Sequence, residues 1–142
     1  REIHTRAFDA LSHLLETLAS ELAHAGVADY VRFEAVLLED LGFGLDLESC
    51  AATGARDDLT HVSPKSGRAV SAGVAAPYRD KLFALPPFLL DHTAQPSPKD
   101  LADGLALTGF FLSRSVLEPG GIAVPAARTR LVERLAAERP AS

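Results

Sequence analysis

Apolar residues recur at intervals of three and four positions along the first part of the chain, which is the spacing of one face of a helix. The pattern predicts a helix over about residues 5–24, with Gly26 beyond its end. Its apolar face would comprise Phe8, Leu11, Leu15, Leu18 and Leu22. The same spacing returns at Tyr30, Phe33, Leu37 and Leu41, and Gly42 then favours a left-handed cap.

A different pattern follows in the middle of the chain. The segments 59–62 and 68–71 flank the turn sequence Ser-Pro-Lys-Ser-Gly, which predicts a short two-stranded hairpin. Pro77 suits the first turn of a short helix running to about Phe83. The pair Pro86-Pro87 would end that helix.

Two further helices are expected in the last third. Ser97 can cap a helix that starts at Pro98, and Asp100 favours its positive end. Gly104 and Gly109 lie inside that helix, where each costs about 1 kcal/mol relative to alanine, so they either permit close packing or occur by chance. A last helix is predicted over about 125–137. The expected fold class is mainly α, a single helical domain with a small β-hairpin insertion.

Charge and composition narrow the function classes. Of the 142 residues, 1–60 hold four arginines against twelve acids, a balance of −8, whereas 61–142 hold ten Lys and Arg against seven acids, a balance of +3. A net charge of −5 argues against strong nucleic-acid binding by this chain alone, and the basic part leaves room for an anionic partner. No apolar run is long enough for a membrane span, and no signal peptide is visible. We therefore expect a cytoplasmic location and no membrane partner.

Few residues offer catalytic or metal chemistry. Cys50 is the single cysteine, and with His61 it falls short of the four ligands of a structural zinc site, so we expect no metal and no cofactor. The sequence Ala-Val-Ser-Ala-Gly around Ser71, with His92 downstream, distantly matches the nucleophile elbow of serine hydrolases. Arg128 shares an apolar stripe with Leu131 and Leu135, so it must snorkel, pair with an acid or border an anion-accepting groove.

One stretch of sequence is specific enough to indicate a family. Tyr-Val-Arg-Phe-Glu at 30–34, Leu-Gly-Phe-Gly-Leu-Asp-Leu at 41–47 and then Cys50 resemble the C-terminal part of the bacterial DNA repair protein family RecO. The Ser-Pro-Lys-Ser-Gly turn and the helix of Arg128 resemble later parts of that family. The resemblance implies that 1–142 form a RecO-like C-terminal helical domain, with 49–75 as a zinc-ribbon-like insertion. It also implies an N-terminal OB-fold domain that these residues do not contain.

The resemblance also explains the single cysteine. Many RecO proteins hold a structural zinc with two C-x-x-C pairs. The corresponding positions here are Cys50 and Thr53, then Ser71 and Val74, so three of the four ligands are replaced. Apolar contacts from Leu47, Leu59, Val62 and Val70 would have to hold the insertion instead.

By the same resemblance, the whole protein is a recombination mediator and not an enzyme. It would bind single-stranded DNA mainly through the N-terminal domain, bind the tail of the single-stranded DNA-binding protein, and help load RecA together with RecR. An arginine beside an apolar slot would suit a tail that ends in an apolar residue and a carboxylate. Candidate tail-binding residues are Arg32, Phe33, Leu37, Arg128 and Arg130.

A purely structural role for these residues also stays open. Arg32 follows Asp29 by three positions, so the two can form a surface ion pair. Two rival functions also stay open, a small serine hydrolase that uses Ser71 and a helical adaptor without a role at DNA.

Overall fold

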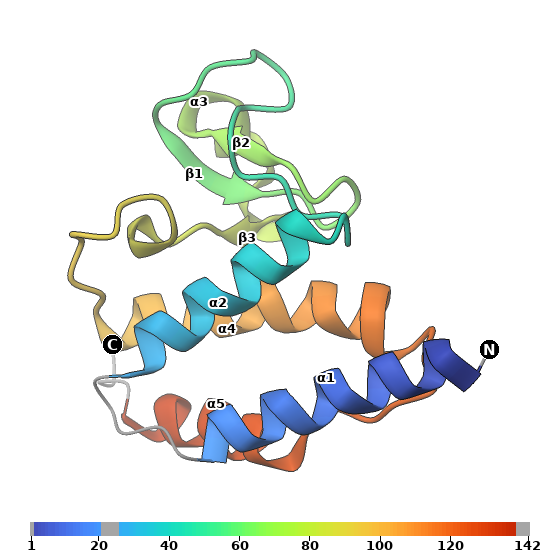
Figure 1. Ribbon diagram of the computed structural model, residues 1–142. Helices are drawn as coiled ribbons and strands as arrows, with labels where there is room; N and C mark the ends of the chain where they lie inside the picture. Colours follow the sequence, from blue (N-terminus) through green and yellow to red (C-terminus); the bar gives the residue numbers. More distant parts are fainter. Residues whose placement is uncertain (1, 21–25, 139–142) are drawn as a thin grey trace.

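Four helices form the body of the protein, as seen in a computed structural model that describes residues 2–20 and 26–138. They are α1 (Glu2–Ser20), α2 (Val27–Asp40), α4 (Pro98–Leu112) and α5 (Ala126–Glu138). Helix α1 packs along α5, α2 packs along α4, and α4 joins the two pairs by also contacting α5 (Figure 1). The predicted mainly α fold class is confirmed.

The predicted first helix is confirmed over the described residues Glu2–Ser20, and its predicted end near residue 24 lies outside the described part of the chain. Leu15 and Ala19 of this helix enter the core. The side chain of Phe8, and Leu22 with the rest of 21–25, lie outside the described part of the chain. No helix in the described residues combines the length and the apolar character needed to cross a lipid bilayer.

The ends of the middle helices follow the chemistry expected from the sequence. Gly42 adopts a left-handed φ of 72° just after α2, as the cap prediction required. At the start of α4 the Ser97 hydroxyl accepts a hydrogen bond from the Asp100 amide at 3.1 Å, and the Asp100 carboxylate accepts one from the Ser97 amide at 3.1 Å. This reciprocal capping box satisfies two amides that the helix itself leaves unpaired.

Both glycines inside α4 lie at points of close approach. A Cβ atom at Gly104 would stand 3.0 Å from Val31 of α2 and 3.0 Å from the ring of Phe88. At Gly109 it would stand 2.8 Å from Nη1 of Arg128 in α5. Glycine at these two positions lowers the helix propensity of α4, but it allows α2 and α5 to pack closely against α4. Of the two explanations that the sequence left open, close packing is therefore the one that the structure supports.

The middle of the chain forms a small lobe above the helices, with the strand order β2-β1-β3 (Figure 1). Strands β1 (Leu59–Val62) and β2 (Ala69–Ser71) pair antiparallel, which confirms the predicted hairpin. The two helical segments that follow are α3 (Ala72–Ala75) and the 3-10 helix η2 (Ala76–Lys81).

The predicted helix through Phe83 was wrong at its end. Leu82 is already extended, and Phe83–Ala84 form a third strand, β3, which pairs antiparallel with β1. The Phe83 ring also packs against Phe110 of α4, with centroids 5.0 Å apart. These contacts come from distant parts of the chain and override the local helix signal of Pro77.

Candidate partner-binding site

Arg32 lies at the edge of α2 with its guanidinium tied to three neighbours. Its Nη1 donates to the Asp29 carboxylate at 3.0 Å, which is the surface ion pair that the i, i+3 spacing predicted. Its Nε donates to the carbonyl of Phe88 at 3.0 Å, and the guanidinium carbon lies 5.4 Å from the centre of that residue's ring. The Arg32 side chain is 17% exposed and that of Asp29 is 83% exposed, so the carboxylate can swing away while the arginine stays in place.

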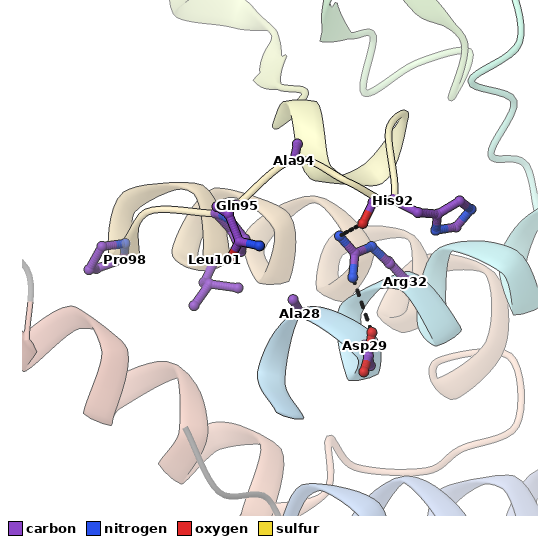
Figure 2. A pocket seen from close by; sticks show the side chains of 9 residues that line it. Ala28, Asp29, Arg32, His92, Ala94, Gln95, Pro98 and Leu101 are labelled. Carbon is purple, nitrogen blue, oxygen red and sulfur yellow. Dashed lines mark hydrogen bonds and ion pairs between the residues drawn. The ribbon is translucent and has the colours of Figure 1, made fainter. Parts of the chain in front are cut away.

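A hollow of about 390 Å³ opens beside Arg32, between the start of α2 and the start of α4. Figure 2 shows Arg32 at its edge, bonded to Asp29 and to the carbonyl of His92. The wall is mixed, with polar His92 and Gln95 beside an apolar part. The apolar part is formed by Ala28, Ala94, Pro96, Pro98 and Leu101. A carboxylate bound to Arg32 could thus place an attached apolar group against that part of the wall.

Arg128 is buried, and its guanidinium forms an ion pair with Glu34. Nε and Nη2 of Arg128 each donate to the carboxylate at 2.8 Å, which is a bidentate pair. Nη2 also donates to the Leu105 carbonyl at 2.9 Å and to the Thr108 hydroxyl at 3.2 Å. Thr108 in turn donates to Glu34 at 2.6 Å. Of the three possibilities that the sequence left open for Arg128, pairing with an acid is observed, and the residue also lines a groove.

The surroundings shift two ionisation equilibria in this cluster. Burial lowers the pKa of Arg128, but the hydrogen bonds and charge of Glu34 outweigh it, so the net shift is upward and the guanidinium stays charged. Burial, followed by the charge of Glu34, raises the pKa of Tyr30. The Tyr30 hydroxyl is buried without a hydrogen-bond partner among the described residues.

The five predicted tail-binding residues do not line one surface. Arg32 lines the hollow of Figure 2, whereas Arg128 lines a groove beside α5 and Arg130 a small hollow near α1. Phe33 and Leu37 lie on α2 outside the hollow, with Phe33 exposed and Leu37 half-buried. Arg130 is exposed and lies 3.6 Å from the Glu16 carboxylate.

Sequence reasoning missed Glu34 as the partner of Arg128, although a signal for it existed. Glu34 follows Tyr30 and precedes Leu38 by four positions each, so it lies on the buried stripe of α2. An acid on one apolar stripe and an arginine on another predict a buried pair. The contributions of the Phe88 and His92 carbonyls to Arg32 carried no sequence signal, because any residue supplies a carbonyl.

In the small β lobe, residues at the expected ligand positions lie close to Cys50. The Ser71 amide donates to Cys50 Sγ at 3.4 Å, and hydrogen bonds from Ser71 and Thr53 lower the pKa of the thiol to about 6 despite its burial. Three of the four expected ligand positions therefore lie together. Within the described residues no cluster of three or more His, Cys, Asp or Glu side chains could hold a metal. The four apolar residues expected to hold the insertion, Leu47, Leu59, Val62 and Val70, are all buried.

The surroundings of Ser71 do not match a nucleophile elbow. Ser71 ends an antiparallel strand and precedes a helix of four residues, whereas the elbow needs a strand of a parallel sheet and a long helix. Within the described chain, no hydrogen bond joins its hydroxyl to a histidine, and the His61 ring bonds to Thr60 at 2.8 Å. The geometry gives no support to the hydrolase alternative.

A helical body, a ribbon-like insertion held by apolar contacts and an arginine-edged hollow are typical of a binding domain. Comparison with known proteins gives the family: the chain belongs to the RecO C-terminal family, because the family model described as "Recombination protein O C terminal" matches residues 1–120. The resemblance seen at 30–50 is confirmed.

Curated relatives agree with this assignment. The chain is 50% identical over 135 residues to "DNA repair protein RecO" of Caulobacter sp. (strain K31), covering 95% of this chain and 55% of the relative. It is 52% identical over 144 residues to the protein of that name from Rhizobium etli, covering 100% of this chain and 56% of the relative. The chain thus spans about half the length of these relatives. No solved structure gives a significant match.

Proposed function

We propose that this chain is the C-terminal domain of a DNA recombination mediator, and that it acts by binding a protein partner. Family membership and the relatives named "DNA repair protein RecO" support the class of function. In the proposed role the whole protein works in the cytoplasm, anneals single strands and assists RecA loading together with RecR. The N-terminal part would carry most of the single-strand contact.

The proposed partner is the tail of the single-stranded DNA-binding protein, and the proposed site is the hollow beside Arg32. The observation that carries this proposal is a half-buried guanidinium at the edge of a hollow whose wall includes apolar side chains. A terminal carboxylate would displace the exposed Asp29 from Arg32, and the last side chain would pack on Leu101 and Ala28 (Figure 2). Phe33 and Leu37 could extend the apolar contact along α2.

The N-terminal end of α4 would help this site to accept acidic groups. Pro98 lines the hollow at the first turn of α4, whose N-terminus carries a partial positive charge. Lys99 follows with a side chain that is 63% exposed, although it pairs with Asp103 at 2.6 Å. Acidic residues that precede the terminal carboxylate would approach this positive helix end, with Lys99 next to the lining residue Pro98 in the sequence.

The test is a titration of a fluorescein-labelled tail peptide against wild type and Arg32→Ala. Loss of a charge-assisted contact in a partly desolvated site should cost about 1.5 to 3 kcal/mol, roughly ten- to a hundredfold in affinity. Asp29→Asn should bind slightly tighter, because it removes the carboxylate that competes for Arg32. Arg130→Ala serves as the matched control and should bind like wild type.

Two results would contradict the proposal. Equal affinity of wild type and Arg32→Ala would exclude this site, and no binding by wild type would remove the tail as a partner of this domain. Circular dichroism on each variant confirms that the fold is kept. Arg128→Ala is unsuited to the test, because it would leave Glu34 buried without its partner.

A further inference from the structure

Arg32 offers only part of its guanidinium to the hollow beside it. An arginine carries one N–H group on Nε and two on each of Nη1 and Nη2. Nε of Arg32 donates to the Phe88 carbonyl at 3.0 Å and Nη2 to the His92 carbonyl at 3.4 Å, so main-chain oxygens hold the edge formed by these two nitrogens. Nη1 donates to Asp29 at 3.0 Å. Among the described residues, one N–H on Nη1 and one on Nη2 are left without an acceptor.

The end of the guanidinium that carries Nη1 and Nη2 faces the hollow. Figure 2 shows it turned toward Gln95 and Leu101, while the bonds to Asp29 and His92 leave to its sides. Two parallel N–H groups on one edge of an arginine match the two oxygens of a carboxylate. The free edge therefore suits a carboxylate that enters from the hollow.

The two carbonyls on the other edge belong to one short segment. Phe88 lies in the 3-10 helix η3 (Pro87–Leu89), and His92 lies in the turn that follows. Hydrogen bonds close this turn around His92, because the Asp91 carboxylate accepts from the Thr93 amide at 2.9 Å and from the Thr93 hydroxyl at 2.6 Å. The turn thus fixes the direction in which the His92 carbonyl points.

The ring of Phe88 supports the same guanidinium. Phe88 is 1% exposed, and the centre of its ring lies 5.4 Å from the guanidinium carbon of Arg32, within the range of a cation–π contact. Gly104 of α4 leaves room for this ring. An arginine that a partner must first order loses rotational freedom on binding. Because Arg32 is already held, that cost falls on folding and not on binding.

We infer that Phe88 and His92 are positioning residues for Arg32. Their carbonyls and the Phe88 ring hold the guanidinium so that only its Nη1 and Nη2 edge meets the hollow, where it binds a carboxylate end-on through both oxygens. Arg128 is used the other way, because its Nε and Nη2 edge binds Glu34. The inference rests on the tail site proposed above, and adds which edge of the arginine that site uses and what holds it.

The first measurement needs no peptide. Heteronuclear NMR detects the Nε–H group of an arginine, and a hydrogen-bonded group exchanges slowly with water. The Nε–H of Arg32 should exchange at least about tenfold more slowly than that of Arg130, whose side chain is 65% exposed. Arg32→Lys identifies the signal by removing it. Equal exchange rates for Arg32 and Arg130 would overturn the inference.

Phe88→Leu tests whether the ring positions the arginine. It should speed the exchange of the Arg32 Nε–H and weaken binding of the tail peptide roughly fivefold, because binding must then order the side chain. Phe111→Leu makes the same change at another buried phenylalanine, which does not line the hollow. It should lower stability as well, but leave both readouts within about twofold of wild type. Equal effects of the two variants would show that Phe88 only packs the core, and would overturn its positioning role.

Two tests that leave Phe88 in place separate the shape of the guanidinium from its charge. Arg32→Lys keeps the charge but loses the edge with two N–H groups, and should bind the tail peptide roughly tenfold more weakly than wild type. In Arg32→Ala, added ethylguanidinium should restore part of the affinity, whereas ethylammonium at the same concentration should not, because only the planar group fits two carbonyls and a ring face. Wild-type affinity in Arg32→Lys, or equal rescue by both cations, would overturn the inference.

The proposed function and the positioning of Arg32 fail in different ways. A wild type with a slowly exchanging Arg32 Nε–H that binds no tail peptide would refute the proposed function and support the positioning. A wild type that binds the tail peptide but has a rapidly exchanging Arg32 Nε–H would support the proposed function and overturn the positioning.

Discussion

Arg32 and Arg128 look alike in the sequence and differ in the structure. Each is an arginine next to an apolar helix stripe, and each forms an ion pair with an acid. The Arg32 pair joins an acid on the same helix that is 83% exposed, whereas the Arg128 pair joins two helices and both partners are at most 6% exposed. An exposed pair contributes about 0 to 1 kcal/mol, and its arginine stays available to other anions. A buried pair is part of the packing, because leaving either partner alone is costly.

The sharpest test of this contrast is to break the buried pair. Arg128→Ala or Glu34→Ala should lower the free energy of unfolding by about 3 to 5 kcal/mol, because each leaves a buried charge without its partner. Urea unfolding followed by circular dichroism measures the loss. Arg32→Ala is the matched control, with an expected loss below about 1 kcal/mol.

A double variant shows whether the loss comes from the unpaired charge. Glu34→Leu combined with Arg128→Leu removes both charges and should recover much of the stability, since apolar side chains of similar size often replace a buried pair without cost. A double variant as unstable as the sum of the single ones would mean that the pair itself supplies the stability.

The next largest expected effect is the loss of tail-peptide affinity when Arg32 is replaced. Arg32→Ala should lose about 1.5 to 3 kcal/mol of binding to the tail peptide while keeping its stability, which separates a partner contact from a structural one. The peptide titration and a urea melt on the same sample give both numbers. A variant that loses stability and affinity together would make Arg32 a structural residue like Arg128.

The close approach of Arg128 to Gly109 of α4 gives a third test. Gly109→Ala places a Cβ atom 2.8 Å from Nη1, so the guanidinium or the helix must shift, at a cost of about 1 to 3 kcal/mol. Gly73→Ala is the control, because its Cβ would meet nothing within 4 Å. Thermal melts of the two variants provide the comparison, and equal melting temperatures would show that Arg128 adjusts freely.

Tyr30 gives the smallest expected effect. Its buried hydroxyl has no hydrogen-bond partner within the described part of the chain, so Tyr30→Phe removes an unsatisfied polar group and should change stability by less than about 1 kcal/mol, toward higher stability if at all. A clear loss in a urea melt would reveal that the hydroxyl takes part in the Glu34 and Arg128 network. Because the pKa of Tyr30 is raised, the result should be the same at neutral and mildly alkaline pH.

Local rules were enough to predict the long helices α2 and α4, the end of α2 and the start of α4. The spacing of apolar residues predicted α2, Ser97 and Asp100 predicted the capping box, and Gly42 predicted the left-handed cap. These features depend on residues within one or two turns of each other. The strand β3 was not predicted. Phe83 is held in an extended conformation by pairing with β1 and by packing against Phe110, and both are distant in sequence.

The sequence by itself also determined the family, through the motif that leads from Arg32 to Cys50. It also gave the expectation, from the resemblance, that one cysteine stands where a zinc site would have four ligands. Only the tertiary structure decided which arginine is free to meet a partner. Arg128 pairs with Glu34 across 94 positions of chain, and Arg32 is held beside a hollow by carbonyls that carry no sequence signature. Whether a charge is available depends on burial and on partners from other elements, and helix periodicity specifies neither.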